Sequence, residues 1–281
     1  MMTTALDDAT IDGLMPRPHV YGTEAFTLRR IDYGEADRIL TLFTPAYGKT
    51  RAIAKGVRKT KSRLAGHLEP FTRSQLLLAT GRELDIVTQA EARERFEGLP
   101  SDFWSATAAW YVAELVDRFL EDADPHPRLY AQFVETLRRL DGQASEPDHA
   151  RSWLTLRYFE LRLLDELGYR PGLHHCVSCD QPLRPEDQGY SPEMGGALCP
   201  ACMRYGGARR LTLSTLKVLR LLQTTEWSAL PRLRLESDVQ AEIEATLQAT
   251  IRYHLERDLK SWAFLQLAPQ QASQQASQQA T

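Results

Sequence analysis

The pattern of apolar and polar residues changes near Pro100, and this change divides the chain into two parts. Before Pro100, short runs of β-branched and apolar residues alternate with polar ones and end at turn residues such as Gly34 and Gly48, which is typical of strands. After it, apolar residues recur every three or four positions, which is typical of amphipathic helices. We therefore expect a small β-domain followed by a larger α-helical domain.

Five short strands are expected in the first part, mostly joined by short turns. They span 26–31, 38–44, 49–54, 71–79 and 83–88. This strand count predicts a small barrel over residues 21–98, and both the five-stranded OB-fold and an SH3-like barrel satisfy it. The long basic connection at 56–70 favours the OB-fold, which commonly binds single-stranded nucleic acid.

Helical spacing begins just after Ser101, which we expect to be an N-cap. Trp104, Tyr111 and Phe119 fall on one stripe and predict a buried helix face. Further helices are expected at 128–140, 150–167, 214–224 and 238–265, with Gly168 as the C-cap of the helix that precedes it. These segments make up an α-helical domain over 99–267, so the predicted class is α+β with two domains.

The ends of the chain and its composition set further limits. Residues 1–20 are expected to be a flexible leader, and the Gln/Ser/Ala tail at 268–281 is expected to be disordered. The 281 residues are 43% hydrophobic and 25% charged, with a formal charge of −3. No run approaches the roughly 20 apolar residues of a membrane-spanning helix, and no secretory signal is evident. We therefore expect a cytoplasmic protein without membrane contact.

Basic residues gather in one segment without any counter-charge in the sequence. No Asp or Glu occurs from Arg38 to Leu68. Such a block of like charge often marks a nucleic-acid surface, although it can also be a solvated loop without a partner. The side chains predicted to contact DNA phosphates are Arg38, Lys49, Arg51, Lys55, Arg58, Lys59, Lys61 and Arg63.

Aromatic residues near these cations are candidates for stacking on bases. Tyr47 is the best candidate, because it lies in a turn beside the basic segment. Phe43 and Phe71 are expected to belong to the core instead.

The four cysteines of the chain form a spacing that is typical of a metal site. Cys176 and Cys179 make one pair, Cys199 and Cys202 make the other, and two such pairs complete a tetrahedron of thiolates. Two disulfides or four unrelated thiols are the alternatives, but a reducing compartment disfavours disulfides. We predict one structural Zn²⁺ ion that stabilises an insertion at 173–207 between helices.

The sequence offers no set of residues for catalysis. Gly48-Lys49-Thr50 resembles the end of a phosphate-binding loop, but Phe43 stands where that motif needs its first Gly. No nucleophile is paired with a base in a known motif. We therefore expect a protein that is not an enzyme.

Several segments together resemble the bacterial RecO family of recombination mediators. They are 32–40 (DYGEADRIL), 44–49 (TPAYGK), 52–56 (AIAKG), 61–64 (KSRL), 68–71 (LEPF) and 260–261 (KS). Trp262 departs from the family pattern, because a basic residue is expected at this position. The resemblance extends over roughly residues 22–266.

The resemblance implies an N-terminal OB-fold and a helical domain that holds zinc. It implies binding to single- and double-stranded DNA, annealing of complementary strands, and DNA repair in the cytoplasm at the bacterial nucleoid. It also implies partnership with RecR and single-stranded-DNA-binding protein, and indirectly with RecA. Two alternatives stay open from the residues themselves: a zinc-ribbon regulatory factor that binds nucleic acid, and a protein-docking scaffold without annealing activity.

Overall fold

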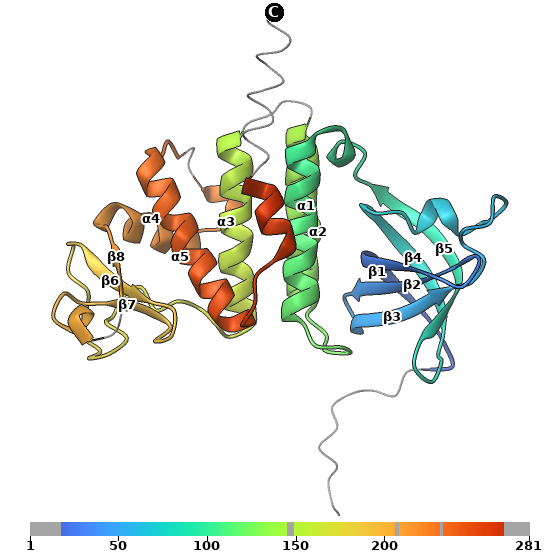
Figure 1. Cartoon of the computed structure of the whole chain (residues 1–281), viewed down its shortest axis with the longest axis horizontal. Helices are drawn as coiled ribbons and strands as arrows, with labels where there is room; N and C mark the ends of the chain where they lie inside the picture. The colour runs from blue at the N-terminus through green and yellow to red at the C-terminus, as the bar shows by residue number, and fades with distance from the viewer. Residues whose placement is uncertain (1–17, 145–148, 206–207, 231–232, 267–281) are drawn as a thin grey trace, which may run out of the picture.

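The computed structural model describes residues 18–144, 149–205, 208–230 and 233–266. A β-barrel lies at one end of the molecule, a group of helices lies in the middle, and a small sheet lies at the other end (Figure 1). Most of the expected leader and the whole expected tail fall outside the described residues. No helix within the described ranges is both long and apolar enough to cross a lipid bilayer.

The N-terminal part folds into a closed barrel of five strands, which confirms the predicted class. The strands are β1 (Val20–Tyr33), β2 (Asp37–Thr44), β3 (Gly48–Ala54), β4 (Thr72–Ala79) and β5 (Asp85–Arg95). Their order around the barrel is β1-β2-β3-β5-β4, and only the β3–β5 pair is parallel. This order is that of an OB-fold, so the SH3-like alternative is set aside.

Two sets of apolar side chains leave the barrel strands in different directions. Leu40, Leu42 and Leu78 fill the barrel interior and are fully buried. Phe26 and Phe43 instead meet Phe133 of the helical domain, with ring centroids 5.0 and 5.7 Å away. Each buried Phe contributes about 1.5–3 kcal/mol, so this contact ties the barrel firmly to the helices. Phe43 and Phe71 are both buried, which confirms their predicted place in the core.

In the described part of the chain the barrel is followed by the helices α1 (Phe103–Phe119), α2 (Pro127–Ala144), α3 (His149–Glu166), α4 (Leu213–Thr224) and α5 (Ser237–Leu255). Short 3-10 turns occur at η1 (Ala65–His67), η2 (Leu99–Ser101), η3 (Cys202–Tyr205) and η4 (Trp227–Ala229). The N-cap of α1 is Asp102, not Ser101, because the Asp102 carboxylate accepts the Ser105 N–H at 2.8 Å. Gly168 has a φ of +80°, as expected of a C-cap.

The expected end of α2 at Leu140 was wrong. The helix continues through Asp141 and Gly142 to Ala144. A Gly inside a helix costs only about 1 kcal/mol, and the burial of Leu137 and Leu140 in the preceding turn outweighs it.

The last predicted helix is also interrupted. α5 ends at Leu255, and Glu256 adopts the left-handed conformation with a φ of +53°. A short helical turn at 260–266 follows and lies across α1, where it is drawn dark red in Figure 1. Its first N–H groups, from Lys260 and Ser261, donate to the Glu114 carboxylate at 3.2 and 2.8 Å. The break places the Trp262 ring 5.6 Å from the Tyr111 ring, so this departure from the family pattern serves packing.

The segment between α3 and α4 contains a sheet that the sequence pattern missed. Its strands are β6 (Gln188–Ser191), β7 (Gly196–Leu198) and β8 (Arg209–Leu211), in the order β7-β6-β8. Gly196 permits a close approach of two backbones, because a Cβ there would lie 2.3 Å from the Gly172 carbonyl oxygen. Tyr190 and Leu198 join one apolar cluster with Leu216 of α4, so this insertion shares the core of the helices.

Candidate nucleic-acid interface and metal centre

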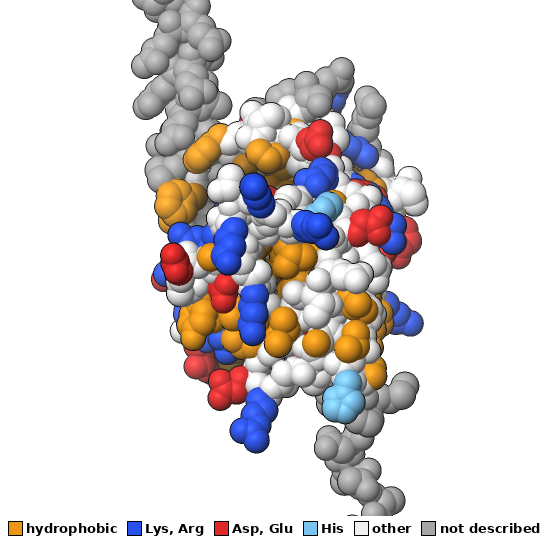
Figure 2. All heavy atoms as spheres, turned by 90° about the vertical axis from the view of Figure 1, so that its right-hand side faces the viewer, with side chains coloured by type: hydrophobic (Ala, Val, Ile, Leu, Met, Phe, Trp, Pro, Cys, Tyr) orange, Lys and Arg blue, Asp and Glu red, His pale blue; other side chains and the backbone are white. Residues whose placement is uncertain are grey.

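Five of the eight predicted DNA-contacting cations are exposed and form no ion pair with another described residue. They lie on β3, directly after it and in the basic connection (residues 56–70), and we call them the five exposed cations: Arg51, Lys55, Lys59, Lys61 and Arg63. Figure 2 views the barrel end of the molecule, where Lys and Arg side chains spread over the upper half and most Asp and Glu side chains stand near the edges. This arrangement leaves positive charge open to an anionic partner.

Arg38 and Arg58 differ from these five because they pair with carboxylates that lie outside the stretch 38–68, which has no Asp or Glu of its own. Arg38 lies 3.0 Å from Asp32 and 3.3 Å from Glu69, and Arg58 lies 3.4 Å from Asp32. The Arg38 hydrogen bond, with the charge of Arg58 nearby, holds the pKa of Asp32 below its usual value. The fold therefore supplies part of the counter-charge that the sequence of this segment lacks.

Lys49 lies at the junction between the barrel and the helical domain. Its Nζ donates to the Asp117 carbonyl oxygen of α1 at 2.8 Å and lies 3.6 Å from the Asp122 carboxylate. Only 13% of its side chain is exposed. Because a cation near a helix C-terminus is favourable, Lys49 helps hold the barrel against the last turn of α1.

Tyr47, the predicted stacking residue, packs on the barrel. Its ring centroid lies 4.5 Å from that of Tyr21, and the side chain is half-buried against the barrel core. Tyr47 therefore differs from the five exposed cations, because its side chain is partly buried against the barrel core.

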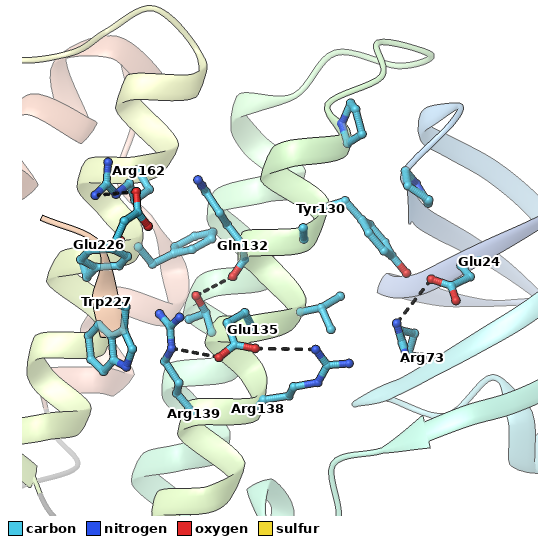
Figure 3. Close-up of a pocket in the computed structure, with 17 residues that line it drawn as sticks. Glu24, Arg73, Tyr130, Gln132, Glu135, Arg138, Arg139, Arg162, Glu226 and Trp227 are labelled. Carbon is cyan, nitrogen blue, oxygen red and sulfur yellow. Dashed lines mark hydrogen bonds and ion pairs between the residues drawn. The ribbon is translucent and has the colours of Figure 1, made fainter. Parts of the chain in front are cut away.

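A groove of about 600 Å³ runs between the barrel and the helices α2 and α3 (Figure 3). Its polar lining includes four arginines from the barrel, α2 and α3, and each pairs with a glutamate of the same lining: Arg73 with Glu24, Arg138 and Arg139 with Glu135, and Arg162 with Glu226. The Arg139 guanidinium lies 4.3 Å from the Trp227 ring centroid, a cation–π distance. The Tyr130 hydroxyl and the Gln132 side-chain oxygen are buried without a hydrogen-bond partner.

Sequence reasoning missed this groove. Its residues come from both domains and fall on helical positions that read as ordinary amphipathic faces. The one signal in the sequence was the series of Arg residues at 138 and 139 close to aromatic Tyr130, and this signal is weak.

The four cysteines lie close together at one end of the molecule. Their sulfur atoms all fall within 4.8 Å of one another, and the Cys179 and Cys199 Sγ atoms are 3.8 Å apart. A tetrahedral ion with metal–sulfur bonds of about 2.3 Å needs sulfur atoms about 3.8 Å apart, so the cluster fits a metal ion. Although burial opposes ionisation, backbone N–H groups of Cys199, Cys179 and Ser178 lower the pKa of Cys176 to about 6. The ring nitrogens of His174 and His175 are not part of the cluster.

The chain combines an OB-type barrel that carries exposed cations with a helical domain that carries a four-cysteine cluster. These are features of a class of two-domain proteins that bind nucleic acid. Comparisons with known sequences identify the family. Residues 19–96 match the family described as Recombination protein O N terminal, and residues 100–263 match Recombination protein O C terminal. The chain therefore belongs to the RecO family of DNA repair proteins, as its sequence motifs indicated.

Curated relatives agree over nearly the whole chain. The DNA repair protein RecO of Roseiflexus sp. (strain RS-1) is 46% identical over 253 residues, which cover 89% of this chain and 86% of that relative. The DNA repair protein RecO of Dehalococcoides mccartyi (strain CBDB1) is 36% identical over 251 residues, covering 89% and 97%. That of Desulforudis audaxviator (strain MP104C) is 38% identical over 248 residues, covering 88% and 96%.

Proposed function

We propose that this chain is a recombination mediator that binds single- and double-stranded DNA and anneals complementary strands. In this role it helps load a recombinase onto strands coated with single-stranded-DNA-binding protein. The observation that carries the proposal is the group of five exposed cations on the barrel of a RecO-family chain. Arg51, Lys55, Lys59, Lys61 and Arg63 have the charge and exposure to contact phosphates.

The physical mechanism needs no bond to be made or broken. Each cation that meets a phosphate releases condensed counterions, and this release drives binding without reading the base sequence. Two strands held on such a surface repel each other less, and their bases stay available for pairing. We therefore propose that the protein is not an enzyme and requires no nucleotide hydrolysis.

The cysteine cluster is proposed to hold one structural Zn²⁺ ion. Cys176, Cys179, Cys199 and Cys202 supply four thiolates, which fill a tetrahedral shell and leave no open position for catalysis. When bound, the ion would join the two ends of the insertion and stabilise its fold.

The proposed partners are RecR and single-stranded-DNA-binding protein, with an indirect link to RecA, in the cytoplasm at the nucleoid. The groove of Figure 3 supports a protein contact, because it combines arginine side chains with the rings of Tyr130, Tyr158 and Trp227. The rings suit an apolar segment of a partner, and the mixed charges of the lining can pair with its polar groups.

The test is strand annealing by the purified protein. Two complementary oligonucleotides are coated with single-stranded-DNA-binding protein and mixed without ATP across a salt series. We expect faster annealing that weakens as salt rises, because the contacts are electrostatic. DNA binding without acceleration would contradict the mediator function and favour a docking or regulatory protein.

A further inference from the structure

An aromatic groove lies between the barrel and the helical domain, on strand β1, helix α1 and the turn 260–266. Its volume is about 630 Å³. Three aromatic residues line it and are exposed: Phe103 by 51%, Trp110 by 39% and Phe264 by 59%. Large aromatic side chains with this much exposure, gathered on one groove, indicate a binding surface.

Cations surround these rings. Arg29 and Arg30 of β1, Arg118 of α1 and Lys260 of the short turn line the same groove. A β-bulge between Thr27 and Arg29 breaks the usual alternation of strand side chains, so neighbouring residues of β1 can line one groove.

Two carboxylates also line the aromatic groove, and both have partners. Glu114 accepts the N–H groups of Lys260 and Ser261 and lies 3.8 Å from Arg118. Asp117 lies 3.4 Å from Arg29 and 3.8 Å from Lys49. These acids fix the geometry of the groove and leave Lys260 exposed at its rim.

A chain of ion pairs connects the aromatic groove to the basic connection. Glu69 contacts Arg30 at 2.6 Å and Arg38 at 3.3 Å. Asp32 in turn contacts Arg38 at 3.0 Å and Arg58 at 3.4 Å. Each carboxylate pairs with two arginines, so alternating arginines and carboxylates extend from the aromatic groove to Arg58 in the basic connection.

We propose that the aromatic groove is a base-stacking site for single-stranded nucleic acid that continues the path of the strand from the basic connection. Phosphates would meet the arginines of the groove that stay partly exposed beside their carboxylates, Arg29 by 54% and Arg30 by 35%, and bases stack on Phe103, Trp110 and Phe264. Aromatic rings beside cations are the usual composition of such sites, because every base has a face that can stack. The proposal rests on the proposed DNA-binding function and assigns it a second site.

An apolar peptide is the other possible occupant of a groove with these rings. Continuity with the basic connection favours nucleic acid, because a strand longer than the groove would reach the exposed cations beyond it, whereas a short acidic peptide would need only the cations beside the rings. The experiment below distinguishes the two occupants.

The test compares oligothymidylates of about 6 and about 20 nucleotides, because one barrel covers about 4–16 nucleotides. Fluorescence anisotropy gives the affinity of the full chain and of three variants, Phe264→Ala, Phe103→Ala and Lys260→Glu. Tyr253→Ala is the matched control, since Tyr253 is 47% exposed on α5 outside the groove. Thermal melting shows whether each variant is folded.

We expect the two Phe variants to bind the long oligonucleotide about five-fold or more weakly, which corresponds to one lost stacking contact. The short oligonucleotide and the Tyr253→Ala variant should change little. In a parallel experiment, 5-iododeoxyuridine placed along the long strand should crosslink to Phe103, Trp110 or Phe264 of the unmodified protein.

Three outcomes would overturn the proposal. The groove variants could keep full affinity and show no crosslink, while Lys59→Ala/Lys61→Ala still weakens binding. This result would contradict the stacking site and leave the proposed function intact. Variants that lose single-stranded-DNA-binding protein but keep DNA would identify a peptide groove. Failure of the unmodified chain to bind DNA at any length would contradict the proposed function itself.

Discussion

Replacing Lys59 and Lys61 with Ala should flatten the salt dependence of DNA binding. Both side chains are exposed and form no ion pair with another described residue, so each is available to a phosphate. The substitutions remove no buried contact, and exposed changes of this kind usually alter stability by less than about 0.5 kcal/mol. An altered affinity would therefore report on the interface and not on the fold.

The magnitude follows from counterion release. On single-stranded DNA each neutralised phosphate contributes about 0.7 to the slope of log K against log salt. If all five exposed cations contact phosphates, the slope of log K against log salt is about −3.5 for the unmodified protein and about −2.1 for the double variant. Between 50 and 200 mM salt, the loss of affinity should then fall from about 130-fold to about 20-fold.

The assay is fluorescence anisotropy of a labelled oligothymidylate over this salt range. The matched control replaces Lys217 and Arg234, which are exposed cations of the helical domain, with Ala. The control should keep the slope of the unmodified protein. An equal slope for all three proteins would refute the assignment of Lys59 and Lys61 to the DNA interface.

Three further predictions concern the metal cluster, the domain junction and a buried carboxyl group. Cys199→Ser should lower the zinc content below one ion per chain and make the insertion sensitive to proteolysis. The control variant Ser178→Ala should retain the ion, and equal metal content in both variants would contradict the ligand assignment. Lys49→Ala should lower the free energy of unfolding in urea by about 1–3 kcal/mol and leave the salt slope unchanged, because it removes the charge-assisted hydrogen bond to the Asp117 carbonyl oxygen of α1. A flattened slope would instead show a phosphate contact. Burial raises the pKa of Glu160 from 4.5 to about 7, so this carboxyl group holds its proton more tightly in the folded protein than in the unfolded chain. The free energy of unfolding should therefore fall as pH rises from about 4.5 to about 7. The Glu160→Gln variant should lack this pH-dependent loss of stability. If the stability of both proteins changes with pH in parallel, Glu160 is not its source.

Much of the fold could be predicted from the sequence because its signals are local. The barrel strands end at turn residues, and the α1 stripe from Trp104 to Phe119 follows helical spacing over several turns. The cysteine spacing likewise places two thiol pairs within reach of one ion, and the structure gathers all four sulfur atoms. These features depend on residues that are close in the chain.

The features that could not be predicted depend on contacts between distant segments. Lys49 meets Asp117 across 68 residues, so its sequence neighbourhood suggested an exposed cation. The strands of the insertion contain only three or four residues, too few for a period of two to be recognised. The break at Glu256 interrupts a continuous apolar pattern, because Leu259 and Leu265 are buried only when the chain turns back onto α1.

The aromatic groove illustrates the same limit. Phe103 and Trp110 lie two turns apart on α1, but Phe264 and the arginines of β1 are distant from them in sequence, and each ring occupies a helical position where an apolar residue is ordinary. Only the fold brings them together beside Arg29 and Arg30.

The central claim is that the exposed cations of the barrel drive annealing, and one measurement tests it most directly. Complementary strands coated with single-stranded-DNA-binding protein are annealed by the unmodified chain and by a variant with Lys55, Lys59, Lys61 and Arg63 replaced by Gln. We expect the variant to melt at the same temperature and to anneal strands about ten-fold or more slowly, because about four phosphate contacts are lost. Equal annealing rates for the two folded proteins would contradict the claim.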